Sequence, residues 1–170
     1  MPIIDVWLRG PVHGVPGTLV PVAHALLQAR EDVARVAVGV PDAVLWARPG
    51  GAASPAFHMF HMAHALDRLM TYARGESLTD PQREALAMER SGDVDEDAAE
   101  LIHRVETTID WSIRQLRCTP ESTLTNERRV GKVGAPSSVL GLLFHAAEHT
   151  TRHTGQLITT LKILAADSKR

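Results

Sequence analysis

The histidines near the end of the chain have the spacing best suited to chemistry. His149 and His153 lie four residues apart inside a long segment of helical pattern. Side chains at positions i and i+4 of an α-helix project from the same face, one above the other. Imidazole nitrogens bind zinc at about 2.0–2.1 Å, so two rings held in this way can share one ion. His145 continues the series, but it lies about 12 Å along the axis from His153, so these two cannot bind the same ion.

A second group of histidines, near residue 60, offers a third ligand. His61 lies three residues from both His58 and His64. Its helical neighbours Phe57 and Leu66 are apolar, which makes His61 the inward-facing candidate. His58 and His64 are expected at the edges of the same buried face.

Two other interpretations compete with a single three-histidine site. In the first, the histidines are only packed and hydrogen-bonded side chains of a helical scaffold. In the second, the chain is a di-iron bundle, which uses Glu-x-x-His pairs on two helices. Glu100 and His103 form one such pair, and the sequence contains no second one. A zincin motif is excluded because Thr150, and not glutamate, follows His149.

Metal-bound histidines also need a hydrogen-bond acceptor for the second ring nitrogen. Glu148, Thr150 and Gln156 are the candidates closest in sequence to the pair on the last helix. Glu148 points about 100° away from His149 around that helix, so it is a weak candidate for a general base.

The composition favours one domain with an aliphatic core. The chain has 170 residues, of which 44% are apolar and only 4% aromatic, and residues 1–170 are expected to form a single domain. Eighteen basic residues stand against 20 acidic ones, for a net charge of −2. Nucleic-acid binding needs a clustered excess of Lys and Arg, so we expect no nucleic-acid partner.

Cys118 is the only cysteine, which excludes an internal disulfide and any zinc site built from several cysteines of one chain. A reducing cytoplasm is the simplest setting for such a protein. The segment Met1–Gly10 contains Asp5 and Arg9 and no long apolar stretch. We therefore expect neither a signal peptide nor a membrane span, and a cytoplasmic location.

Apolar periodicity predicts four long helices. The expected ranges are 17–38, 55–74, 93 or 95 to 117, and 137 or 138 to 166. Ser54 and Pro55 suit the start of the second helix and Gly75 its end. Residues 77–90 are expected to connect the second and third long helices, with one short helix starting near Asp80. A short extended piece is expected around 129–133. Four long helices with one apolar stripe each favour an all-α fold, a four-helix bundle with a short connecting helix.

Two motifs resemble those of the DinB-like superfamily, four-helix bundles that include bacillithiol- and mycothiol-dependent S-transferases. Ser54 followed by His61-Met62-Ala63 is similar to its S-x6-H-[IL]-A pattern. His149 to Gln156 matches its H-x3-H-x-G-Q pattern on the last helix. The order and length of the helices agree as well, so the resemblance covers nearly the whole chain.

The resemblance implies that His61, His149 and His153 bind one divalent metal ion, while His58, His64 and His145 have no family role. Zinc, nickel or iron all suit such ligands, and a low-molecular-weight thiol is the implied co-substrate. Many relatives carry H-H-R-G-Q where this chain has Arg152-His153-Thr154-Gly155-Gln156. Loss of the basic residue after the last ligand bears on how an anionic substrate or thiol is held.

The leading hypothesis from the sequence is therefore a metal-dependent enzyme of hydrolase or thiol S-transferase type, acting on a small-molecule substrate. The alternative is a non-catalytic metal-binding or stress-related helical bundle. Aliphatic bundles of this size often bury a helix face against a second copy, so a homodimer is expected in both cases.

Overall fold

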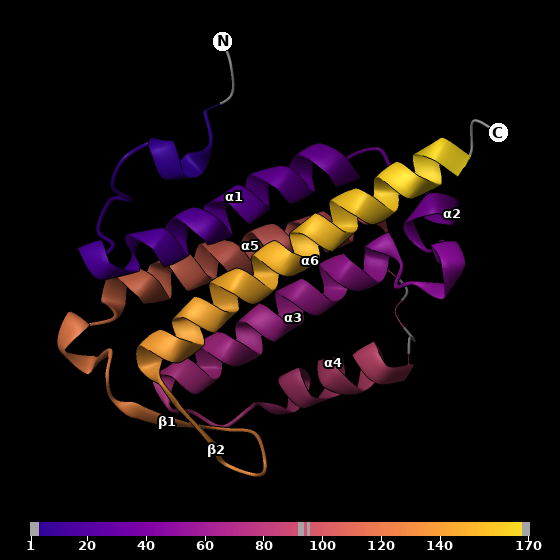
Figure 1. Ribbon diagram of the computed structural model, residues 1–170. Coiled ribbons are helices and arrows are strands. Elements are labelled where there is room, and N and C mark those ends of the chain that lie inside the picture. Colours follow the sequence, from indigo (N-terminus) through magenta and orange to yellow (C-terminus); the bar gives the residue numbers. More distant parts are fainter. Residues whose placement is uncertain (1–3, 92–93, 95, 168–170) are drawn as a thin grey trace.

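Four long helices run side by side in the computed structural model, which describes residues 4–91, 94 and 96–167 (Figure 1). They are α1 (Val20–Ala37), α3 (Pro55–Arg74), α5 (Ala98–Cys118) and α6 (Val139–Asp167). Helices α1 and α3 each pack against both α5 and α6. The prediction of an all-α four-helix bundle is confirmed. None of the described helices is long and apolar enough to span a lipid bilayer.

Short elements join the long helices. The helical ones are η1 (Val6–Leu8), η2 (Gly17–Leu19), α2 (Asp42–Leu45), η3 (Pro49–Gly51), α4 (Asp80–Ser91) and η4 (Glu121–Thr123). The extended piece expected around 129–133 is a hairpin of β1 (Glu127–Val130) and β2 (Ala135–Ser138), paired antiparallel. The strands therefore lie on either side of most of the expected range, and residues 131–134 form the turn. Gly131 and Gly134 both adopt positive φ there, which glycine tolerates best.

Local hydrogen bonds explain where the long helices begin and end. The Ser54 hydroxyl accepts a hydrogen bond from the Phe57 N–H at 3.2 Å and caps α3. Gly75 has φ 81° and ends the same helix in the left-handed conformation. At the start of α6, the Ser138 hydroxyl accepts from the Gly141 N–H at 3.0 Å. These three ends agree with the sequence prediction.

The start predicted for the third long helix is wrong. We expected it near Asp93 or Asp95, which lie outside the described residues, but α5 begins at Ala98. Asp97 is the N-cap, and its side chain accepts from the Glu100 N–H while Glu100 accepts from the Asp97 N–H. This reciprocal capping box outweighs the general attraction of acidic residues to a helix start.

The core is aliphatic, as the composition predicted. The apolar stripe of α5 is fully or almost fully buried, and its members are Leu101, Val105, Ile109, Ile113 and Leu116. Leucines and methionines of the other three long helices meet this stripe, among them Leu26, Met59 and Leu143.

Helix α4 lies along the outside of α3 (Figure 1). The short helix predicted near Asp80 is therefore confirmed. It carries the chain back along α3, so α3 and α5 run in the same direction (Figure 1). Helix α4 is amphipathic but buries little of its surface; its buried residues are Gln82 and Ala85.

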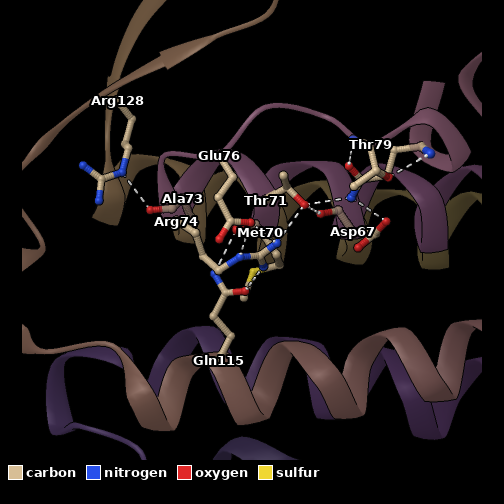
Figure 2. A network of polar contacts seen from close by, with 10 residues as sticks. Asp67, Met70, Thr71, Ala73, Arg74, Glu76, Thr79, Gln115 and Arg128 are labelled. Carbon is tan, nitrogen blue, oxygen red and sulfur yellow. Dashed lines mark hydrogen bonds and ion pairs between the residues drawn. The ribbon is translucent and has the colours of Figure 1, made fainter.

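A polar network fastens the first turn of α4 to α3 (Figure 2). The buried Gln82 amide donates to Asp67 Oδ2 and to Thr71 Oγ1, both at 2.7 Å. The side-chain oxygen of Gln82, Oε1, accepts a hydrogen bond from the Thr79 N–H at 2.9 Å. All hydrogen-bonding atoms of this amide are thus used, which sets the position of α4 along α3.

The same network reaches α5 and the hairpin at the end of α3 (Figure 2). The Gln115 amide donates to the Met70 carbonyl at 2.9 Å, and Arg74 donates to Gln115. The Arg128 guanidinium donates to the Ala73 carbonyl at 2.8 Å. Main-chain carbonyls at the end of α3 are thereby paired with side chains of its neighbours.

Replacing Gln82 with Ala should lower the free energy of unfolding by about 1–3 kcal/mol, because it leaves buried partners on α3 without their hydrogen bonds. Urea denaturation of the two proteins measures the difference. Glu84→Gln, at an exposed position of the same helix, is the matched control and should change stability little. Equal stability of Gln82→Ala and wild type would contradict the anchoring role.

Candidate metal centre

Three histidines from two helices meet at one point of the α3–α6 interface. His61 lies in the second turn of α3, and His149 and His153 lie one turn apart in the middle of α6. One nitrogen from each ring lies within 4.8 Å of the others, and all three side chains are partly buried. Among the described residues, this is the group of three whose nitrogen and oxygen atoms could hold a metal ion.

The distance between two of the rings matches shared coordination. His61 Nε2 and His149 Nε2 are 3.4 Å apart. Two ligands at about 2.0–2.1 Å from a tetrahedral ion are separated by about 3.3–3.4 Å. The His153 ring lies 4.6 Å, centroid to centroid, from each of the other two. The three residues selected from the sequence are therefore close enough to share an ion.

The two rings of α6 are uncharged near neutral pH. Burial first, and then the neighbouring His61, lower the pKa of His149 to about 4. Burial and the neighbouring histidines, His61 foremost, lower the pKa of His153 to about 3. A neutral imidazole keeps a free lone pair on one nitrogen, which is the form that binds metals.

Comparison with protein families shows to which family this bundle belongs. The profile of the DinB superfamily matches residues 25–157, which include all four long helices in whole or in part and all three histidines. The chain belongs to the DinB superfamily. Comparison with curated proteins gives no match.

Next to the three histidines, a carboxylate from α4 forms a hydrogen bond with the ring of His61. Glu89 Oε2 lies 2.8 Å from His61 Nδ1. Arg68 donates to both oxygens of the same carboxylate, at 2.7 and 3.1 Å. Burial alone would raise the pKa of Glu89, but the hydrogen bonds with His61 and Arg68 outweigh it and lower the pKa. The charged carboxylate therefore accepts a hydrogen bond from the Nδ1–H of His61, and Nε2 of His61 is left to face His149.

A fourth histidine holds the ring of His153. His58 Nδ1 lies 3.1 Å from His153 Nδ1, so one proton is shared between the two nitrogens. His58 is only 5% exposed. The expectation that His58 lies at the edge of the buried face is wrong, because the packing of α6 on α3 covers it.

Two of the three candidate hydrogen-bond partners from the neighbouring sequence, Glu148 and Thr150, bind other groups. Glu148 pairs with His145 and Arg152 on the outer face of α6, and the Thr150 hydroxyl donates to the Ala146 carbonyl. Partners come instead from another turn of α3 and from α4, at sequence separations of 95 residues for His58–His153 and 28 for His61–Glu89. No local pattern in the sequence marks contacts of this range.

Of the remaining candidates, His103 and His64 lie outside the group, whereas the ring of His145 lies 5.5 Å, centroid to centroid, from that of His149. The exposed His103, of the Glu-x-x-His pair, lines a surface hollow with Glu100 on α5. His64 packs against Phe60, with ring centroids 4.3 Å apart. Its Nε2 is buried and has no hydrogen-bond partner among the described residues.

His64 should make the stability of the fold depend on pH. Burial, helped by Arg104 and Arg68 and opposed by Glu89 and Glu96, lowers its pKa from the ordinary value. As the pH falls below about 6.5, the unfolded chain takes up a proton before the folded one does, so stability falls by at most about 1.4 kcal/mol per pH unit for this group.

His64→Gln should therefore lose less stability than wild type between pH 7.5 and 5.5. Urea denaturation at both pH values, in the presence of a chelator, gives the comparison. His145→Gln serves as the control because the His145 side chain is 47% exposed. A pH dependence of His64→Gln identical to that of wild type would refute the assignment.

Proposed function

We propose that this protein is a metal-dependent enzyme that binds one divalent metal ion through His61, His149 and His153 and acts on a small-molecule substrate. The observation that carries the proposal is the approach of three imidazole nitrogens within 4.8 Å of one another at a partly buried point of the bundle. Membership of the DinB superfamily supports the same conclusion.

The residues around the three rings fit a metal ion. Nδ1 of His61 and Nδ1 of His153 are turned to Glu89 and His58, which leaves Nε2 of each ring available toward the centre. His149 directs Nε2 to His61, and its buried Nδ1 has no hydrogen-bond partner among the described residues. Acceptors of this kind fix the tautomer and orientation of metal-bound histidines. A packed histidine scaffold does not require three ring nitrogens to converge.

Three protein ligands leave at least one coordination position open, which is typical of catalytic rather than structural sites. The chemistry supplied by a divalent ion in such a site is acidification of a bound water or thiol and polarisation of an electrophile. Glu89, which binds His61, and Glu148, which binds His145, are both paired with arginine. Neither carboxylate is free to act as a general base. We propose hydrolysis and thiol S-transfer as the two reaction classes, because a bound ion would itself acidify the attacking water or thiol.

The proposal includes zinc, nickel or iron as the ion, a low-molecular-weight thiol as co-substrate of the transferase reaction, and a cytoplasmic homodimer. Exposed apolar side chains support the dimer, since Trp7 and Phe144 are each 64% exposed and a second copy would cover them.

Assays of activated esters, and of electrophiles with a thiol, test the two reactions. Metal binding without either activity would favour the non-catalytic alternative.

Removing any one of the three ligands should abolish stoichiometric metal binding. Elemental analysis of His61→Ala, His149→Ala and His153→Ala should find far less metal than in wild type, because two imidazoles hold divalent ions much more weakly than three. His103→Ala, at an exposed position on α5, is the control variant and should retain the metal. Full metal content in all three ligand variants would refute the site.

Glu89→Gln should weaken metal binding about 10- to 100-fold, the usual effect of losing an acceptor behind a metal-bound histidine. The amide keeps a hydrogen bond with His61 but lacks the negative charge that makes the ring a stronger donor to the ion. Competition with a chromogenic chelator measures the affinity, and Glu84→Gln on the same helix is the control. An unchanged affinity would show that Glu89 serves the fold alone.

A further inference from the structure

A pocket of about 350 Å³ shares a wall with the three-histidine site. We call it the Trp46 pocket; it lies between Trp46, the start of α3 and the end of α4. Two of its lining residues contact His61 directly. Phe57 stacks on the His61 ring with centroids 5.4 Å apart and planes at 5°, and Glu89 binds His61 Nδ1. An occupant of the pocket would thus lie one side chain away from a proposed metal ligand.

The pocket concentrates aromatic side chains in a chain that has few. The whole sequence contains three Phe, three Trp and one Tyr, and Trp46, Phe57 and Phe60 all line this pocket. Met88 adds a polarisable thioether. Such walls favour a flat apolar group, since aromatic rings prefer offset-stacked or edge-to-face contacts with one another. The volume is near the lower end for ligand sites, which suits a small molecule.

Two guanidinium groups give the same pocket a positive charge. Arg48 and Arg90 both line it. Among the described residues, Arg48 donates to the main-chain carbonyls of Ala52 and Gly51 alone, at 3.3 and 3.4 Å. Within the described part of the chain, no carboxylate forms an ion pair with either arginine. Glu89 cannot neutralise them, because its two oxygens are taken by Arg68 and His61.

We propose that the Trp46 pocket binds a small aromatic carboxylate, with its ring between the aromatic side chains and its carboxylate on Arg48 and Arg90. Arginine binds carboxylates through paired, charge-assisted hydrogen bonds. If the protein is the metal-dependent enzyme proposed above, this pocket selects substrates that carry such a group. That role rests on the proposed function, whereas binding itself does not require a metal ion.

A larger groove on the molecule does not suit this ligand. It has a volume of about 590 Å³, runs between α1 and α6, and is lined by Trp7, His24 and Asp32 among others. No lysine or arginine lines it, so it offers an anion no cationic partner; its one acidic residue, Asp32, is paired with Arg35. The two hollows therefore differ in charge, and a neutral aromatic compound is expected to distinguish them less well than benzoate.

The three tryptophans report on three places and allow a direct test. Trp46 lines the proposed pocket, Trp7 lines the groove between α1 and α6, and Trp111 is 62% exposed on α5. In a ¹⁵N-labelled protein with chelator present, each indole N–H gives one NMR signal, assigned by Trp→Phe variants. Titration with benzoate should shift the Trp46 signal to saturation and leave the other two in place.

The charge requirement is tested with a paired variant. Arg48→Gln combined with Arg90→Gln should weaken benzoate binding at least about tenfold, while Arg83→Gln, at an exposed position outside the pocket, should leave it unchanged. Benzyl alcohol, the neutral analogue, should bind more weakly than benzoate.

Three results would overturn the proposal: no saturable shift of Trp46, a shift of Trp7 in its place, or equal binding of benzoate to the double arginine variant. Because the titration is run without metal, its failure leaves the three-histidine assignment standing. Conversely, loss of that assignment in the histidine variants leaves the benzoate result intact.

Discussion

The packing of α3 against α6 is the constraint on which the rest of this structure depends. It brings the ring of His61 to within 3.4 Å of the ring of His149 although 88 residues separate them. Three imidazoles can gather in a partly buried place only if they are uncharged, because protonated rings would repel one another at this distance. The lowered pKa values of His149 and His153 keep these two rings uncharged near neutral pH.

The short helix α4 joins the stability of the fold to the chemistry of the site. Gln82 fastens it to α3, and two turns later Glu89 faces His61 from the same side of the helix. A buried carboxylate is costly unless it is paired, and Arg68 supplies the paired charge from α3. Movement of α4 would therefore change the tautomer and orientation of a proposed metal ligand as well as the packing beneath it.

Most of the fold could be predicted because its signals are local. Ser54 and Gly75 mark the ends of α3 through hydrogen bonds and a positive φ that depend on a few adjacent residues. The start of α5 was misplaced because several acidic residues precede it, and only Asp97 has the spacing to Glu100 that closes a capping box. A helix start is decided by specific hydrogen bonds and less by the density of charge around it.

By itself the sequence determined the four helices, their apolar stripes and the three histidines, because helical periodicity and i, i+4 spacing are properties of a continuous chain. Only the tertiary structure decided what stands behind those histidines. Glu89 and His58 were not predicted as partners, since they reach His61 and His153 from another element or from a distant position in the chain. Hydrogen bonds across helices depend on crossing geometry and on side-chain packing, and no spacing within one helix encodes either.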